Sequence, residues 1–422
     1  MRASRLELQE GVTLSVIPTQ KFKTVRIFIR FTTKHERRLA SQRTLLTSVL
    51  ETSSAKYPRQ TDLSAQLAQM YGASFGMNVT KKGNLHQLNV SMSLVNGKYL
   101  SDERLLSDGV DFLEEVLFSP LTKDGLFDEA TFELEKANLI EYIESVQEDK
   151  QALAGLKLHE LYFDTSSDQG VPSFGLAQDL RETSNADLMK AYQKMMTEDQ
   201  VDIIVVGDVT QEEMAQLFSK WHFSQTKRVQ PDIFYRQDFR PVVSEQVLRE
   251  NVTQSKLNLA YHTDIYYTDE EVYALTVFNG LFGGFPHSKL FMNVREKESL
   301  AYYASSSIDS FRGLVTVQTG IDGQNREKVM HLISEQLTAL AQGDFSQQAL
   351  LQTKAMIQNH LLLSLDNAQA LSEMEYMHAW LPNTRKTPEE YIEKVMQVTK
   401  EEVQEIAKKL RLQAVFFLEG SE

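Results

Sequence analysis

The sequence predicts an α+β protein that is built from two homologous halves. Three observations lead to this prediction: the length of 422 residues, the interleaving of helices and strands, and a similar ending to each half. A chain of this length is too long for one hydrophobic core and suits two or more domains. The segments VDIIVVGD at 201–208 and LQAVFFLEG at 412–420 are both apolar strands that follow an amphipathic helix. Their similarity indicates a duplication with a period of about 200 residues.

Hydrophobic periodicity predicts the elements of the first half, with alternation indicating strands and helical spacing indicating helices. Strands are expected at 12–17, 25–31, 73–79, 85–94 and 201–206. Helices are expected at 44–53, 62–70, 105–118, 128–147, 151–163, 187–196 and 211–221, and Asp128 is expected to cap the fourth of them. An irregular segment at 222–241 mixes Gln, Pro, Arg and aromatic residues without a period. We interpret it as a linker, which places the halves at 1–221 and 242–422.

The second half is expected to repeat the same order of elements. Strands are predicted at 257–261, 300–308, 314–319 and 414–418, and helices at 270–281, 290–297, 326–341, 346–366, 368–380 and 388–410. A glycine-containing loop, FGGFP at 282–286, separates the first two helices. Either loop flexibility or close backbone packing explains its glycine pair. We expect Gly283, Gly284 and the 222–241 linker to be the flexible parts.

Composition excludes several classes of protein. Hydrophobic residues make up 42% and charged residues 24%, which is the balance of a folded globular protein. The net charge of -14 argues against nucleic-acid or anionic-membrane partners. No run approaches the roughly 18–20 apolar residues of a membrane helix, and no signal segment is evident. The absence of cysteine excludes disulfides, thiolate metal sites and a cysteine nucleophile, so we expect a cytoplasmic location.

The histidines are too scattered for a hydrolytic zinc site. Such a site usually takes two imidazoles one helical turn apart. The closest two histidines here are His360 and His378, which are 18 positions apart. We therefore predict no structural or catalytic zinc in this chain.

One segment carries a specific resemblance. Residues 281–305, LFGGFPHSKLFMNVREKESLAYYAS, closely resemble the signature of the C-terminal half of M16 zinc metallopeptidases. The matching positions are Gly283, Gly284, Ser288, Leu290, Phe291, Arg295, Glu296, Lys297, Leu300, Ala301 and Tyr302. The order of elements matches along the whole chain as well. The resemblance implies two M16-type, metallohydrolase-like halves, each a mostly antiparallel sheet backed by helices, which form a clamshell.

The resemblance breaks at the zinc motif. The family carries HxxEH on a helix of the first half, and a further zinc-binding Glu on a later helix. The matching helix here has Ser48 and Thr52 at the two histidine positions, and only the base-like Glu51 remains. The later helix is 128–147, where the ligand position falls on Tyr142 or on the adjacent Glu141. One carboxylate does not hold zinc tightly, so we expect no autonomous peptide hydrolysis.

Arg295 and Tyr302 remain intact. In the family, such a pair binds the substrate backbone and stabilises the developing oxyanion, so the resemblance implies a catalytic role for both and substrate binding by Gly283, Gly284 and Ser288. Taken alone, Arg295 could simply form a surface ion pair, and Tyr302 could simply pack at the end of a strand. The surrounding signature favours the functional interpretation.

The resemblance also implies a function. Some bacterial M16 enzymes are pairs in which one subunit brings HxxEH and the other brings the Arg/Tyr pair without zinc. This chain looks like the second type, an accessory subunit of an endopeptidase that is inactive alone, with zinc only in the HxxEH-containing partner. It is most similar to M16-like proteins associated with 5-aminopentanol modification of elongation factor P in Bacillus-type bacteria. Its substrates would be peptides or short polypeptides. The alternatives are a non-catalytic binding scaffold in protein modification or processing and, without the partner, a homodimer.

Overall fold

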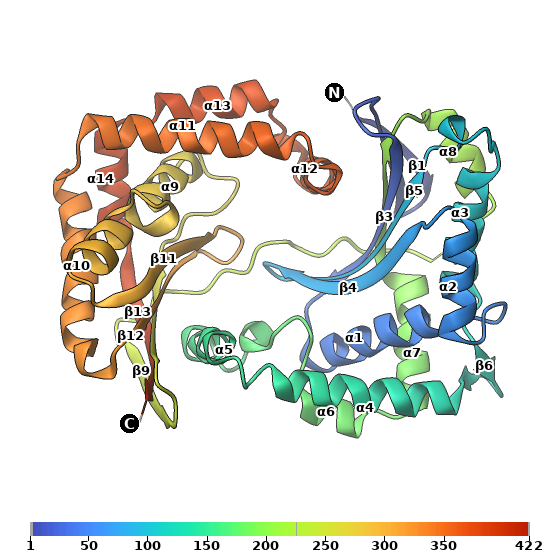
Figure 1. Ribbon diagram of the computed structural model, residues 1–422, viewed down its shortest axis with the longest axis horizontal. Helices are drawn as coiled ribbons and strands as arrows, with labels where there is room; N and C mark the ends of the chain where they lie inside the picture. The colour runs from blue at the N-terminus through green and yellow to red at the C-terminus, as the bar shows by residue number, and fades with distance from the viewer. Residues whose placement is uncertain (1–2, 225, 421–422) are drawn as a thin grey trace. The chain divides into compact units, whose positions relative to one another are not determined.

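The computed structural model describes residues 3–224 and 226–420, which form two compact units (Figure 1). The first unit comprises Met1–Ser145, Pro172–Asp232 and Leu365–Asn383. The second unit comprises Val146–Val171, Ile233–Ser364 and Thr384–Glu422. Each unit therefore takes in one segment that lies far from the rest of it in the sequence.

The first unit is built on a six-stranded sheet with the order β1-β2-β8-β3-β5-β4. Neighbouring strands are antiparallel except for the parallel pair β2 and β8. The strands are β1 (Ser4–Gln9), β2 (Val12–Pro18), β3 (Thr24–Lys34), β4 (Ser74–Lys82), β5 (Leu85–Val95) and β8 (Gln200–Gly207). A separate two-residue hairpin joins β6 (Thr122–Lys123) to β7 (Leu126–Phe127).

Helices cover both faces of this sheet. They are α1 (Arg37–Thr52), α2 (Gln60–Gln69), α3 (Leu105–Phe118), α4 (Glu129–Ser145), α6 (Ala177–Glu182), α7 (Asn185–Glu198), α8 (Gln211–Phe218) and α12 (Ala368–Trp380). Strand β3 shows how the faces differ, because side chains alternate along a strand. Ile27, Ile29 and Phe31 enter the main hydrophobic core with α1, while Arg30 and Thr32 face α12.

The second unit is built on a five-stranded sheet with the order β11-β12-β10-β13-β9. Its strands are β9 (Ser244–Glu250), β10 (Ser255–His262), β11 (Ala301–Asp309), β12 (Leu314–Ile321) and β13 (Arg411–Gly420). The helices are α5 (Lys150–Tyr162), α9 (Val272–Asn279), α10 (Arg326–Gln342), α11 (Gln347–Ser364), α13 (Pro388–Gln397) and α14 (Lys400–Lys409), with the π-helical segments η3 (Gly280–Gly284) and η4 (Leu290–Lys297). Helix α5 packs on one face of the sheet, and α9, α10 and α14 pack on the other.

The two sheets share one topology. The order β2-β8-β3-β5-β4 corresponds to β9-β13-β10-β12-β11, and the parallel pair β2 and β8 corresponds to β9 and β13. The prediction of two halves, each a mostly antiparallel sheet backed by helices, is therefore confirmed. The two strands whose sequences suggested a duplication, β8 and β13, occupy equivalent positions. The proposed half boundaries at 1–221 and 242–422 follow this repeat in chain order, and they remain a prediction.

Most predicted elements are present, and the exceptions have local causes. The sequence missed the edge strands β1 and β9 and the short helix α6. One expected helix at 388–410 is two helices, because the Thr399 side chain accepts a hydrogen bond from the Glu402 N–H and starts α14 afresh. Asp128 caps α4 as predicted, since its carboxylate accepts the Thr131 N–H at 3.0 Å.

The 222–241 segment is irregular in its described residues, yet both of its ends are packed. In the first unit, buried Arg228 donates to the carbonyl oxygens of Met196 and Asp199. In the second unit, the Tyr235 N–H donates to the Phe311 carbonyl at 3.0 Å. Separately, none of the helices in the described part of the chain combines the length and apolar composition that a membrane span requires.

Candidate functional site

The C-terminal turn of α1 presents the three positions where the zinc motif would lie. Leu46, Val49 and Leu50 turn into the core, so that Ser48, Glu51 and Thr52 share the opposite, half-buried face at helical spacing. The helix ends at Thr52, and the next residue, Ser53, adopts an extended conformation. The local sequence therefore fixes which three side chains this face presents.

Glu51 is hydrogen-bonded to an edge strand. Its carboxylate accepts the backbone N–H of Met77, a residue of β4 at the edge of the sheet. Burial raises the pKa of Glu51, the Met77 hydrogen bond lowers it, and the nearby charge of Glu135 adds to the rise. The net direction is upward, so this carboxyl holds its proton more tightly than an exposed glutamate does.

The structure resolves which residue of the later helix comes close. The Thr52 hydroxyl lies 2.9 Å from the Ser48 carbonyl oxygen and 2.9 Å from the Glu135 carboxylate. It can donate its hydrogen bond to either of these oxygens. Glu141 and Tyr142, the two alternatives from the sequence, are both exposed two turns further along α4. Only the tertiary packing of α1 against α4 distinguishes Glu135 from the other glutamates of this helix.

This donor set does not fit zinc. Zinc sites in hydrolases use three protein ligands that include nitrogen or sulfur donors. Here the Glu135 carboxylate accepts from the Thr52 hydroxyl, and Glu51 already accepts a backbone N–H. Among the described residues, no three His, Cys, Asp or Glu side chains come together as a metal site requires.

Arg295 lies in the last turn of η4, in the second unit. Its guanidinium stacks 4.5 Å from the centre of the Phe291 ring, and its Nε lies 3.5 Å from the Glu296 carboxylate. The side chain remains 41% exposed. Such a cation is oriented by one aromatic face and still accessible to a ligand.

Tyr302 is held outward by an irregularity in β11. Ala301 pairs with Ile321 and Tyr303 pairs with Gly320, so Tyr302 is the extra residue of a β-bulge. It is 68% exposed. Tyr303 behaves differently, because its hydroxyl donates to Gln151 and burial raises its pKa to about 12.

A tight turn links these two residues. The Glu298 N–H donates to the Asn293 carbonyl at 3.3 Å, and the Leu300 N–H donates to the Val294 carbonyl at 3.2 Å. Ser299 between them has a positive φ of 51°, the left-handed conformation that ends many helices. The turn fixes how η4 passes into the bulge that carries Tyr302.

The glycine-rich segment has a packing role in this structure. The expected loop at 282–286 is wrong for its first part, because η3 continues α9 through Gly284. A Cβ at Gly283 would lie 2.6 Å from the Ser306 backbone nitrogen, and one at Gly284 would lie 2.9 Å from the Asn279 amide. Ser288 is fully buried, and its hydroxyl accepts the Phe291 N–H at 3.4 Å. Of the five site residues predicted from the signature, Gly283 and Ser288 are buried, whereas Gly284, Arg295 and Tyr302 are accessible.

The chain is similar to known proteins along its whole length. A family model described as the peptidase M16 inactive domain matches residues 183–357. The chain is 36% identical over 413 residues to a probable inactive metalloprotease, YmfF, of Bacillus subtilis, covering 98% of this chain and 96% of that protein. It is 26% identical over 306 residues to an uncharacterized zinc protease, YmxG, of the same organism, covering 71% and 72%.

Solved structures agree with these sequence matches. A conserved protein from Enterococcus faecalis V583 matches with a TM-score of 0.95 and 53% identity, covering 99% of both chains. A peptidase M16 inactive domain from Pseudomonas fluorescens matches with a TM-score of 0.79 at 16% identity, covering 100% of this chain and 99% of that one. The second similarity shows a shared fold.

Proposed function

The chain belongs to the M16 peptidase family, and from this membership we propose that it is a catalytically incomplete subunit that pairs with a zinc-bearing M16 partner. The partner would carry the HxxEH motif and the zinc. This chain would supply Arg295 and Tyr302 to the substrate of the joint site. Alone, it would not hydrolyse peptides.

The observation that carries this proposal is the α1 face described above. Hydroxyl groups of Ser48 and Thr52 stand where the family resemblance implies imidazoles, and Glu51 hydrogen-bonds to a backbone N–H. Without a metal, no bound water is acidified for Glu51 to deprotonate. The similarity to a probable inactive metalloprotease points the same way.

Arg295 and Tyr302 suit a role in transition-state stabilisation. Peptide hydrolysis develops negative charge on the carbonyl oxygen, and donors oriented in advance stabilise that charge where water is excluded. The guanidinium carries a permanent positive charge and is oriented by Phe291. The Tyr302 hydroxyl projects outward from its bulge and can donate one hydrogen bond.

Extended peptides or short polypeptides are the proposed substrates. An edge strand such as β11 can accept a peptide by strand addition, with main-chain hydrogen bonds giving affinity. The resemblance to M16-like proteins associated with 5-aminopentanol modification of elongation factor P suggests one cytoplasmic process in which such a subunit would act.

The test is a mixing experiment with an HxxEH-containing M16 paralogue from the same organism and a peptide library. We expect cleavage only when both chains are present. Arg295→Ala and Tyr302→Phe should each lower turnover by about tenfold or more while the zinc content of the partner stays unchanged. Arg38→Ala, which alters an exposed arginine in the first unit, is the matched control and should leave turnover unaltered.

Unchanged turnover in both variants would show that Arg295 and Tyr302 do not contribute to catalysis. Peptide binding without any cleavage in the mixture would favour the scaffold alternative. Cleavage by the isolated chain that a chelator abolishes and zinc restores would contradict the proposal outright.

A further inference from the structure

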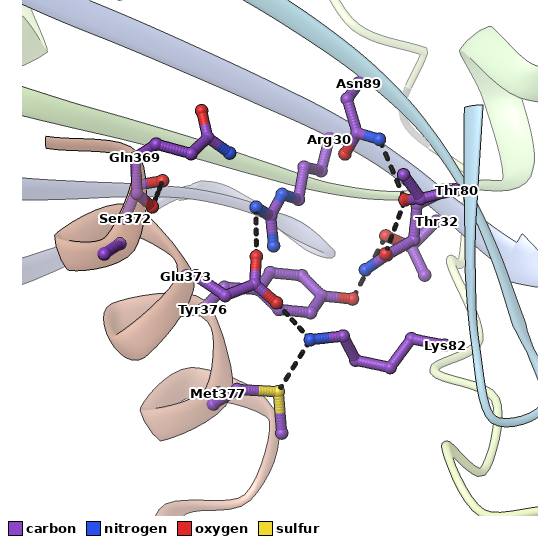
Figure 2. Close-up of polar contacts among 12 residues, drawn as sticks. Arg30, Thr32, Thr80, Lys82, Asn89, Gln369, Ser372, Glu373, Tyr376 and Met377 are labelled. Atoms are coloured by element: carbon purple, nitrogen blue, oxygen red, sulfur yellow. Dashed lines mark hydrogen bonds and ion pairs between the residues drawn. The ribbon is translucent and has the colours of Figure 1, made fainter. Parts of the chain in front are cut away.

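A polar pocket of about 270 Å³ opens on the α12 side of the first sheet. Strands β3, β4 and β5 form its floor, and the first turns of α12 form one wall. Figure 2 shows the side chains that meet there. All of them belong to the first unit, so the pocket is complete within one compact body.

Strand alternation explains why the floor is polar. The core-facing residues of β3 are apolar, which leaves Arg30 on the opposite face, where it is 4% exposed. Its guanidinium stacks 4.5 Å from the centre of the Tyr376 ring and donates to Glu373 (Figure 2). Lys82 donates to the other oxygen of the same carboxylate. Glu373 therefore positions two cations from two strands beside one opening.

The pocket is electropositive on an acidic protein. Two cations of the lining, Arg30 and Lys82, reach the one acid, Glu373. Lys81 also borders the pocket, but strand alternation directs its side chain to the other face of the sheet. Burial alone would raise the pKa of Glu373, but the charges of Arg30 and Lys82 outweigh it and lower that pKa. Two cations against one carboxylate leave these side chains with a net positive charge, whereas the chain as a whole carries a net charge of -14. An anionic group would be attracted here and repelled from most of the remaining surface.

Neutral donors complete the lining. The Asn89 amide donates to the Asn78 side-chain oxygen at 3.1 Å and to the Thr80 hydroxyl at 3.0 Å. Asn78 and Asn89 both belong to the lining. Gln369 projects from α12 toward Arg30 and adds another amide (Figure 2). A carboxylate, with two acceptor oxygens, matches this combination of cations and amides.

We propose that this pocket binds a carboxylate of the peptide on which the subunit acts, either an acidic side chain or the C-terminus. The pocket volume suits one such group and its stem, since pockets for whole drug-sized ligands run from roughly 300 to 1,000 Å³. That the ligand is a peptide rests on the proposed function. The pocket would then select substrates by charge, at a place separate from Arg295 and Tyr302.

The test uses purified chain and a neutral, coumarin-labelled decapeptide in three forms. The first has blocked ends and no acidic residue, the second has one internal Glu, and the third has a free C-terminal carboxylate. We expect the second or the third to bind at least about tenfold more tightly than the first, and whichever does identifies the source of the carboxylate. Equal or undetectable binding of all three forms would overturn the proposal.

Two variants test the location of the site. Gln369→Glu places a like charge in the pocket without cost to the fold, because an acidic residue is favourable in the first turn of a helix. Lys82→Gln removes one cation. Each should abolish the preference for the carboxylate forms, whereas Lys123→Gln, an exposed lysine of the β6 hairpin, should retain it. Retention in Gln369→Glu, with its circular dichroism spectrum unchanged, would refute the assignment.

These outcomes are separable from those of the mixing experiment. Loss of turnover in Arg295→Ala together with unchanged carboxylate preference in Gln369→Glu would refute the proposal that the pocket binds a carboxylate. The subunit proposal would stand. If Gln369→Glu abolishes the carboxylate preference while Arg295→Ala leaves turnover unchanged, the pocket proposal stands and the catalytic role of this chain is refuted.

Discussion

The Thr52 hydroxyl lies 2.9 Å from the Glu135 carboxylate, and this contact joins the end of α1 to the middle of α4. The family resemblance assigns a zinc-binding histidine to position 52 and a zinc-binding glutamate to a later helix. From this contact we propose that Glu135, rather than Glu141 or Tyr142, stands at the position of that glutamate.

Restoring the imidazoles should restore metal binding. Ser48→His with Thr52→His puts two histidines one turn apart on α1, with Glu135 as the third ligand. We expect equimolar zinc in this double variant by elemental analysis, and none in the parent chain.

The double-histidine variant can also show whether Glu135 or Glu141 acts as the third zinc ligand. Adding Glu135→Gln should weaken zinc affinity by about tenfold or more, whereas adding Glu141→Gln should not. An effect of Glu141→Gln alone would instead assign the ligand position two turns further along α4.

Replacing Glu51 by Gln should stabilise the protein at neutral pH. The amide oxygen still accepts the Met77 N–H, and the unfavourable buried charge beside Glu135 is removed. We expect a gain of less than about 2 kcal/mol in the free energy of unfolding by urea.

The stability gained in Glu51→Gln should depend on pH. Because the pKa of Glu51 is raised in the folded state, the folded chain binds more protons than the unfolded chain between the two pKa values. The parent therefore loses stability as pH rises through that window. The advantage of Glu51→Gln should vanish below about pH 4, under the ordinary glutamate pKa, and an advantage that grows on acidification would contradict this account.

Glu373→Gln should destabilise the first unit. Arg30 is 4% exposed and would lose its charged partner. Because the Glu373 side chain is 36% exposed and partly screened by solvent, we expect a loss of about 1–2 kcal/mol. Glu182→Gln, in the exposed pair with Arg38, is the control and should change stability by less than about 1 kcal/mol.

The loss in Glu373→Gln should also depend on pH. The neighbouring cations lower the folded pKa of Glu373, so its contribution is present above the ordinary glutamate pKa of about 4.3 and disappears as pH falls through the lowered value. A gap between parent and variant that persisted unchanged at pH 2 would exclude the ion pair as its source.

Gly283→Ala should destabilise the second unit by about 1–3 kcal/mol, because the added carbon would overlap the Ser306 backbone. Gly155→Ala is the matched control, since its helix position in α5 leaves the new methyl 3.9 Å from the nearest atom. That control should be neutral or stabilising by up to about 1 kcal/mol. Thermal unfolding compares the two, and an equally benign Gly283→Ala would favour a flexible or ligand-contacting glycine.

The elements that sequence predicted well are those with local signals. Helices α3 and α12 begin and end at the predicted residues, and β8 and β13 were recognised as repeats. Strands β1 and β9 gave weaker signals because they are exposed edge strands. In β1 the alternation is limited to Leu6 and Leu8, and β9 has no apolar alternation. The η3 segment was missed because glycines usually indicate loops. Here they allow a helix to approach β11 closely.

Arg30 illustrates what pattern reasoning could have noticed and what it could not. A charged residue in the apolar strand β3 signals a partner or a site on the other face. That partner, Glu373, lies 343 positions away on α12. No periodicity in either segment connects them.

The sequence by itself determined the two-halved α+β class, the missing imidazole pair and the signature that carries Arg295 and Tyr302. Each of these is written in residue identity or in spacing over a few turns. Tertiary structure alone decided that α12 packs on the first sheet, that Glu135 lies beside Thr52, and that Arg30, Lys82 and Glu373 surround one pocket. These depend on which distant surfaces exclude water together, and local spacing does not encode that choice.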